Sequence, residues 1–255
     1  MDQYIAGKHS VLEALRSGRP IGKIWVSENT HKPSIQPILF EARQQGVVVT
    51  YANKKKLDQM VPQIQHQGVV AQIAAYDYVD LEDLLLKVRH EEREKAPFFV
   101  ILDEIEDPHN FGSILRTADC AGVDGVIIPK RRSAGLNATV AKVSAGAAEY
   151  VPVARVANLA QTIERLKEQG IWVAGADASA DQEVYEADLR LPLALVIGNE
   201  NKGIGRLIKE RCDFLMKLPM SGHISSLNAS VAAAIIIYEA VRQRRARRSR
   251  VPPAS

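Results

Sequence analysis

From residue 98 onward, short runs of consecutive apolar residues alternate with segments whose apolar residues recur at helical spacing. The runs predict strands at Phe98–Leu102, Gly125–Ile128, Ile171–Ala174, Leu193–Ile197 and Phe214–Leu218. The intervening segments predict helices at Phe111–Ala121, Thr139–Ala145, Leu159–Gln169, Ile204–Arg211 and Asn228–Arg245. Apolar strands separated by helices indicate an α/β fold with a parallel sheet that is covered on both faces. Ligands of such sheets bind beyond the carboxyl ends of the strands, so we expect the loops there to carry the chemistry.

The region before residue 79 has its own pattern of shorter elements. It predicts helices at His9–Arg16 and Ser34–Gln45, and strands at Lys23–Ser27, Gly46–Tyr51 and Gly68–Ala74. The next segment, Asp80–Lys95, places four apolar residues on one face of an amphipathic helix, which Ala96-Pro97 ends. We therefore predict a small α/β domain at residues 1–78, a linker with a helix at 79–97, and a second domain at 98–255.

The composition excludes several classes of protein. The 255 residues are 46% hydrophobic and 25% charged, which is typical of a globular protein and not of a disordered one. The longest apolar stretch, around Val231–Tyr238, is too short to span a membrane, and the first ten residues contain no apolar signal core. Two cysteines, Cys120 and Cys212, cannot build a disulfide framework. These features predict a cytoplasmic protein with reduced thiols.

The formal net charge of +3 is distributed unevenly. Residues 1–78 contain nine Lys or Arg and six Asp or Glu, whereas residues 97–241 contain fourteen and eighteen. The last fourteen residues contain six arginines and no acid. Basic ends suit a polyanion such as RNA, although a solubilising tail is an equally good interpretation. Candidate RNA contacts, which could also be solvated surface, are Lys54, Lys55, Lys56, Lys130, Arg131 and Arg132.

The loop after the first strand of the second domain leads into a helix. Asn110 is a candidate N-cap of that helix. Arg116 is a charge in an apolar segment, and it could pair with Asp119 or meet an anionic substrate. A group of carboxylates precedes the helix, at Asp103, Glu104, Glu106 and Asp107. No His or Cys accompanies them in liganding position, so we predict a solvated acidic loop and no metal site.

Two later segments also carry candidate chemistry. The loop at 198–205 lacks the Gly-Lys-Ser/Thr of a phosphate loop and the third glycine of a dinucleotide fingerprint, so it predicts a glycine-permitted bend from which Glu200 projects. In the segment at 217–231, Asn228 could simply cap the helix that follows. That helix is apolar on every face over Ala229–Tyr238, so it must be buried in its own core or against another subunit.

Together the three segments resemble the signature motifs of the SpoU/TrmH family of SPOUT-class RNA methyltransferases. The matching residues are Asn110-x₅-Arg116, then Gly198-Asn-Glu200-x₂-Gly203-Ile, then Leu218-Pro-Met220 with Ser226-Leu-Asn228-x-Ser230-Val, within residues 98–245. The N-terminal unit contains Gly7-Lys-His-Ser-Val-Leu-Glu-Ala-Leu15 and His66-Gln-Gly-Val-Val-Ala71. It resembles the ribosomal-protein-like substrate-binding domain of the RlmB-type branch, which methylates guanosine ribose in 23S rRNA.

This resemblance implies a C-terminal α/β knot behind a small N-terminal domain, a homodimer that uses the last helix, and S-adenosylmethionine as cofactor. The implied cofactor contacts are Gly198, Leu218 and Leu227, with Gly175 and Met220 lining the same pocket. The implied catalytic residues are Arg116, Asn110, Glu200, Ser226 and Asn228. An arginine is too basic to accept a proton at neutral pH, so we expect Arg116 to orient the ribose hydroxyl and stabilise its developing charge. Asn110 and Glu200 would hold Arg116 or its surroundings, and Ser226 and Asn228 would shape the pocket.

The expected reaction is methylation of a ribose 2′-hydroxyl in RNA, with a guanosine of 23S rRNA as the leading target. One alternative is a tRNA ribose methyltransferase, although tRNA enzymes of this family lack such an N-terminal domain. An rRNA-methylating resistance enzyme would share the two-domain layout. A non-catalytic RNA-binding ribosome-assembly factor is the alternative of another class, and the presence of Arg116, Glu200, Ser226 and Asn228 argues against it.

Overall fold

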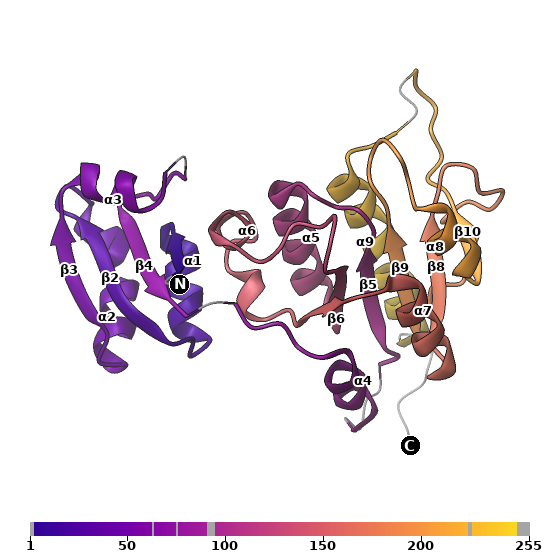
Figure 1. The fold of residues 1–255 in the computed structure, drawn as a ribbon, viewed down its shortest axis with the longest axis horizontal. Helices are drawn as coiled ribbons and strands as arrows, with labels where there is room; N and C mark the ends of the chain where they lie inside the picture. The colour runs from indigo at the N-terminus through magenta and orange to yellow at the C-terminus, as the bar shows by residue number, and fades with distance from the viewer. Residues whose placement is uncertain (1–2, 63, 75, 91–94, 224–225, 249–255) are drawn as a thin grey trace. The chain divides into compact units, whose positions relative to one another are not determined.

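The computed structural model describes residues 3–62, 64–74, 76–90, 95–223 and 226–248, which form two compact units (Figure 1). The first unit contains the chain up to Asp77 together with the stretches 111–116 and 135–150, and the second contains the remainder. No helix in the described ranges has the length and apolar character needed to cross a membrane.

A four-stranded sheet with the order β1-β4-β2-β3 organises the N-terminal unit. Its strands are β1 (Gln3–Ala6), β2 (Ile21–Ser27), β3 (Val48–Ala52) and β4 (Val69–Ile73). Strands β2 and β3 run parallel, and β4 runs antiparallel to both β1 and β2. The carboxyl ends of β1, β2 and β3 therefore lie at one edge of the sheet. Helices α1 (Lys8–Arg16), α2 (Gln36–Gln44) and α3 (Lys54–Met60) connect the strands, and a 3₁₀ turn, η1 (Lys32–Ile35), precedes α2.

Helix α3 was not predicted, because a run of three lysines hides its helical pattern. Asn53 caps the helix with its side-chain oxygen, which accepts a hydrogen bond from the Lys56 N–H at 2.9 Å. Leu57 is the one buried residue of the helix, and it packs in a small core with Trp25 and Val70. A charged run followed by a single apolar anchor thus forms a short helix on this sheet. Strand β1 was also missed, because it is only four residues long.

The second unit contains a six-stranded parallel sheet with the order β10-β8-β9-β5-β6-β7. Its strands are β5 (Phe98–Leu102), β6 (Gly125–Pro129), β7 (Val153–Val156), β8 (Trp172–Ala176), β9 (Leu193–Ile197) and β10 (Phe214–Met216). Strands β5 and β9 are buried along their whole length, which explains their unbroken apolar sequences. Strand β7 was not predicted, because it is a four-residue edge strand with an exposed arginine.

The remaining helices are α4 (Leu81–His90), α5 (Pro108–Ala121), α6 (Ala138–Val143), α7 (Leu159–Glu168), α8 (Arg206–Arg211) and α9 (Ala229–Arg248), with a 3₁₀ turn, η2 (Ala147–Glu149). Leu84 of α4 and Ile163 of α7 belong to one apolar cluster with Phe99 of the sheet. The amphipathic helix predicted at Asp80–Lys95 therefore packs as part of the second unit, and α9 contacts β9.

The start of α5 differs from the prediction. Asp107, and not Asn110, is the N-cap, since its side chain accepts a hydrogen bond from the His109 N–H at 2.8 Å and Pro108 occupies the first helical position. Helix α5 therefore begins three residues earlier than predicted, and Asn110 lies buried within its first turn. Its side chain is free to make contacts other than capping.

Helix α9 is buried by its own chain on one face only. Ala233, Ile236 and Ile237 are buried. Val231, Ile235 and Tyr238 lie on another face and are 46%, 36% and 49% exposed. The helix was predicted to be buried in its own core or against another subunit. Its own core covers one face and leaves the apolar stripe of Val231, Ile235 and Tyr238 exposed.

Two arginines near the C-terminus serve the fold. Arg244 donates hydrogen bonds to the carbonyl oxygens of Ala96, Pro97, Leu189 and Leu191 at 2.6–3.2 Å, and its guanidinium lies 4.5 Å from the ring centre of Phe98. Burial lowers the pKa of Arg244 to about 10. Arg242 forms an ion pair with Glu239 at 2.7 Å. The predicted basic tail includes these two residues, and its part after Arg248 lies outside the described residues.

Candidate active site

The first two motif loops are neighbours because β5 and β9 are adjacent parallel strands. The loop after β5 and the loop after β9 therefore leave the sheet side by side. Asp103 joins them, since its carboxylate accepts a hydrogen bond from the Gly205 N–H at 2.8 Å. The Asn199 side chain also donates to the Glu104 carbonyl at 3.2 Å. Two segments that are about a hundred residues apart in the sequence are thus held together by their own side chains.

Three predicted catalytic residues meet at these loops and form a hydrogen-bonded set. The Asn110 amide donates to Oε1 of Glu200. The Asn228 amide donates to Oδ1 of Asn110 at 2.9 Å and to Oε1 of Glu200 at 3.2 Å. The other oxygen of Glu200, Oε2, has no hydrogen-bond partner among the described residues. We call this group, Asn110, Glu200 and Asn228, the amide–carboxylate set.

Asn228 has two roles at once. Its Oδ1 accepts hydrogen bonds from the N–H groups of Ser230 at 3.0 Å and Val231 at 3.3 Å, and from the Ser230 hydroxyl at 2.6 Å. These bonds satisfy the first turn of α9. The capping interpretation and the site interpretation of Asn228 therefore both hold, because the oxygen caps the helix while the nitrogen reaches Asn110 and Glu200.

A closed turn positions Glu200. The N–H of Asn199 donates to the Gly203 carbonyl at 3.1 Å, and the Gly203 N–H donates back to the Asn199 carbonyl at 2.8 Å. Gly203 has a φ of +68°, which favours glycine. A Cβ on Gly198 would lie 2.3 Å from the carbonyl carbon of Gly203. Both glycines are therefore required for the turn, as the predicted bend implied.

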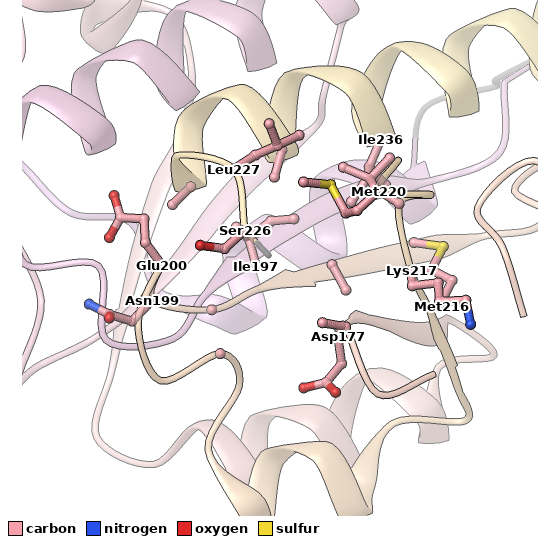
Figure 2. A pocket seen from close by; sticks show the side chains of 17 residues that line it. Asp177, Ile197, Asn199, Glu200, Met216, Lys217, Met220, Ser226, Leu227 and Ile236 are labelled. Atoms are coloured by element: carbon pink, nitrogen blue, oxygen red, sulfur yellow. The ribbon is translucent and has the colours of Figure 1, made fainter. Parts of the chain in front are cut away.

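A pocket adjoins the amide–carboxylate set at the carboxyl ends of β8, β9 and β10, below the start of α9 (Figure 2). The pocket together with its open mouth encloses about 680 Å³. Most of its lining is apolar. The labelled side chains in Figure 2 are Asp177, Ile197, Asn199, Glu200, Met216, Lys217, Met220, Ser226, Leu227 and Ile236.

Four of the five predicted cofactor contacts line this pocket, namely Gly198, Leu218, Met220 and Leu227. Gly175 does not line it. A Cβ at Gly175 would lie 2.7 Å from Leu215 and 3.0 Å from the Cys212 sulfur. Gly175 therefore permits close packing between β8 and its neighbours, next to the lining residue Ala176.

The pocket offers unused hydrogen-bond donors. The main-chain N–H groups of Leu218, Met220 and Leu227 have no hydrogen-bond partner among the described residues. Main-chain N–H groups in folded proteins are almost always paired with protein, water or ligand. The pocket thus combines apolar walls with free donors, an arrangement that suits a flat heterocycle with acceptor nitrogens.

Three polar residues of the lining, Asp177, Asn199 and Lys217, were not predicted as site residues. Asp177 follows β8, and its carboxylate pairs with Lys209 at 2.7 Å. Burial raises the pKa of Asp177, but hydrogen bonds from Lys209 and Ser179 outweigh burial and hold the pKa below its ordinary value. Asn199 organises the turn described above. The sequence signal for Asp177 was its place three residues after the predicted strand Ile171–Ala174, near the edge where ligand sites of parallel sheets occur.

The acidic loop is solvated only in part: Glu106 and Asp107 are exposed as predicted, whereas Asp103 and Glu104 are engaged. Asp103 is 7% exposed, and burial raises the pKa of its carboxyl group. Glu104 instead receives hydrogen bonds from Arg132 at 2.9 Å and Lys202 at 3.4 Å, and the bond from Arg132 lowers the pKa of Glu104. Within the described part of the chain, no cluster of three or more His, Cys, Asp or Glu has a geometry that could hold a metal.

Arg116 is not part of the amide–carboxylate set. It is exposed on α5, six residues after Asn110, so it points about 120° away from Asn110 around the helix axis. Among the described residues it has no ion pair and no side-chain hydrogen bond, so the predicted pairing with Asp119 is absent. Ser226 is exposed at the pocket. The six basic residues of the two predicted RNA-contact runs are all exposed, and Arg132 is paired with Glu104.

Comparison with known proteins identifies the class. Residues 97–238 match the model of the SpoU rRNA Methylase family, and residues 4–79 match that of the RNA 2′-O ribose methyltransferase substrate-binding domain. The chain therefore belongs to the SpoU family of RNA methyltransferases, whose methyl donor is S-adenosylmethionine. The predicted fold is confirmed, with a parallel SPOUT-type sheet and a small N-terminal α/β domain.

Individual relatives agree with this assignment. The chain is 57% identical over 241 residues to YacO of Bacillus subtilis (strain 168), a proposed TrmH family tRNA/rRNA methyltransferase, covering 94% of this chain and 96% of that protein. The SpoU methyltransferase AviRb from Streptomyces viridochromogenes, solved in complex with the cofactor AdoMet, has a TM-score of 0.79 and 25% identity over 96% of this chain and 91% of its own. The A. aeolicus TrmH/SpoU tRNA modifying enzyme has a TM-score of 0.56 and 32% identity over 69% of this chain and 90% of its own.

Proposed function

We propose that this protein methylates the 2′-hydroxyl of a ribose in RNA, with a guanosine of 23S rRNA as the target. The observation that carries the proposal is the amide–carboxylate set of Asn110, Glu200 and Asn228, which adjoins a pocket at the carboxyl edge of the parallel sheet. All three residues belong to the motifs that match the SpoU family. Residues 4–79, which match a 2′-O ribose methyltransferase substrate-binding domain, support the ribose as acceptor.

The pocket fits S-adenosylmethionine in its chemistry. The apolar walls and the free N–H groups of Leu218, Met220 and Leu227 suit an adenine ring, and the carboxylate of Glu200 suits a positively charged sulfonium. We assign Gly198 to holding the turn that shapes the pocket. When bound, the cofactor supplies a methyl group that is activated for attack by its bond to positively charged sulfur.

The residues of the protein have to position a ribose 2′-hydroxyl, which loses its proton when its oxygen is methylated. Glu200 is held by two amide donors on Oε1, which leaves Oε2 free to orient the ribose or Arg116. Arg116 is exposed and unpaired among the described residues, so it can approach the RNA and stabilise negative charge on the attacking oxygen. Ser226 contributes its hydroxyl at the mouth of the pocket.

The presence of a separate N-terminal unit beside the methyltransferase domain favours rRNA as the substrate. We assign RNA binding to residues 1–78 and methyl transfer to residues 98–255, joined by the segment at 79–97. The A. aeolicus tRNA modifying enzyme corresponds to 69% of this chain, so part of this chain has no counterpart in that enzyme, which argues for a different substrate. Its 32% identity nevertheless keeps tRNA ribose as the alternative acceptor.

We further propose a homodimer that forms through α9. The stripe of Val231, Ile235 and Tyr238 is exposed and apolar, and burying such a stripe is favourable. Replacement of Ile235 by Glu should convert a dimer into a monomer in analytical ultracentrifugation. A monomeric wild-type protein would contradict this part of the proposal.

The activity is tested with labelled S-adenosylmethionine and purified protein. Bulk tRNA and undermethylated ribosomal RNA are offered separately, and 2′-O-methyl groups are mapped by their block to alkaline cleavage. A single labelled guanosine in 23S rRNA is the expected result. Label in tRNA would establish the alternative acceptor, and no cofactor binding would contradict the enzymatic function.

A further inference from the structure

The N-terminal unit contains a second pocket, which the reaction described above does not use. It lies at the edge of the sheet where β1, β2 and β3 end and β4 begins. Residues from four separate segments line it, including Lys8, Thr30, Lys54 and Gln67, and the pocket with its mouth holds about 820 Å³. The physical rule that places a ligand site at the carboxyl edge of the second sheet thus also applies to the parallel strands of the first.

The lining is basic and polar. Lys8 and Lys54 contribute ammonium groups, and Lys54 has no ion pair among the described residues. The single lining carboxylate, Asp58, is engaged with the His66 ring at 3.1 Å. Asn29, Gln65 and Gln67 add amide groups that can donate and accept. This combination suits a ligand that carries negative charge and several hydrogen-bonding groups.

The part of the lining at residues 66–68 is held by its own hydrogen bonds. His66 is 5% exposed, and its Nδ1 accepts a hydrogen bond from the Gly68 N–H at 2.9 Å, so Nε2 carries the proton towards Asp58. A Cβ on Gly68 would lie 2.0 Å from the Thr30 hydroxyl, and Gly68 has a φ of +83°. The His66-Gln-Gly68 sequence thus fixes one side of the pocket before any ligand arrives, which lowers the cost of binding.

Among the described residues that line the pocket, none is Phe, Tyr or Trp. The aromatic rings of the lining are the imidazoles of His31 and of the buried His66, so ammonium groups, amides and hydroxyls make up most of the polar lining. Phosphate and ribose contacts of this kind position a nucleic acid without reading its bases. The lining is thus suited to binding the sugar–phosphate backbone of RNA.

We propose that this pocket binds a nucleotide of the RNA substrate other than the one that is methylated, with its phosphate between Lys8 and Lys54. That the ligand is RNA rests on the function proposed above. Lys55 and Lys56 belong to the same basic run as Lys54 but lie outside the lining. Of the three lysines, only Lys54 is therefore expected to contact the phosphate in the pocket.

The test compares two double variants that remove the same charge from neighbouring positions. One is Lys8→Gln with Lys54→Gln, and the matched control is Lys55→Gln with Lys56→Gln. Affinity for an unmodified 23S rRNA transcript is measured by filter binding at several salt concentrations. The pocket variant should bind about tenfold more weakly, with a salt slope smaller by about 1, and the control should change by less than about threefold.

Two further readouts separate this proposal from the others. Calorimetry with S-adenosylhomocysteine should give unchanged affinity in both variants, which shows that the second unit is intact. In methylation assays the pocket variant should show a raised KM for RNA with kcat retained at saturation. Equal weakening in both variants, or none in either, would overturn the pocket proposal. If the wild-type protein binds RNA but transfers no methyl group, the proposed activity fails while the binding comparison still decides the pocket.

Discussion

The pockets of the two units occupy equivalent places on their sheets but differ in lining. The pocket of the second unit combines apolar walls with the Glu200 carboxylate (Figure 2). Glu200 is hydrogen-bonded to the other two members of the amide–carboxylate set. The pocket of the N-terminal unit has lysines and side-chain amides, and Lys54 is unpaired among the described residues. The first arrangement is suited to fixing a small molecule and a reacting group, and the second to holding a charged strand.

The difference shows how one topological rule can serve two tasks. The carboxyl edge of parallel strands supplies a place where loops converge, and the residues in those loops determine what is bound. In the second unit, glycines at 198 and 203 allow the loop to close and to present Glu200. In the N-terminal unit, the buried His66 is fixed by Gly68 and Asp58, and Lys54 has no ion pair among the described residues. The variants below test this division from the largest expected effect to the smallest.

Arg116→Ala should lower kcat about a thousandfold, because Arg116 is proposed to stabilise negative charge on the attacking oxygen. The exposed side chain makes no ion pair among the described residues, so the melting temperature should remain within about 2 °C of wild type. Single-turnover methylation at saturating RNA measures the effect. Near-wild-type turnover would remove Arg116 from the catalytic group.

Arg244→Ala should lower the free energy of unfolding by about 3 kcal/mol, because four carbonyl oxygens lose a charged donor. Denaturant titration measures this change. RNA affinity of the folded variant should stay within about twofold of wild type, since the guanidinium is committed to the fold. A large loss of RNA affinity with unchanged stability would show instead that this arginine belongs to an RNA surface.

Asn228→Ser separates the two roles of Asn228. Serine keeps the cap of α9, whereas the amide that reaches Asn110 and Glu200 is lost. We expect kcat to fall about a hundredfold with little change in stability. The comparison variant Asn228→Ala should lose the same activity and, in addition, about 1 kcal/mol of stability. Full activity of the serine variant would reduce Asn228 to a helix cap.

Asp103→Asn should produce the smallest effect, on the pH dependence of stability. Burial raises the pKa of Asp103 in the folded protein, so the folded state binds more protons than the unfolded state just above the ordinary aspartate pKa. The contribution of Asp103 to stability is therefore present at low pH and is lost as pH rises through the raised pKa. The variant should lack this slope in denaturant titrations between about pH 4 and pH 7. An identical slope in both proteins would contradict it.

Strands that are buried on both faces were the most predictable part of the fold. Strands β5 and β9 match their predicted bounds to the residue, because every one of their side chains is buried. The start of α5 was misplaced, since Asp107 and Asn110 are both acceptable caps by residue type. Helix α3 was hidden by its lysines. The local sequence pattern therefore predicts a strand correctly when burial alone determines it. It misplaces the end of a helix when two side chains could each serve as the cap.

The candidate site was predictable as residues but not as an arrangement. The motif spacing indicated Asn110, Glu200 and Asn228, yet their contact depends on β9 lying next to β5, and strand order is not written in the local pattern. The same limit applies to Gly175, which lies one residue before the lining and permits close packing. Asp177 was overlooked because a single aspartate after a strand carries little signal.

The division between the two pockets is tested most directly by hydrogen–deuterium exchange of the full chain with each ligand alone. S-adenosylmethionine should slow exchange in peptides that cover residues 198–204 and 216–223, and leave residues 27–31 and 65–68 unchanged. An unmodified 23S rRNA transcript should slow exchange at residues 27–31 and 65–68. The account would be contradicted if the cofactor gave no protection around the pocket of the second unit. It would also be contradicted if RNA gave no protection around the pocket of the N-terminal unit.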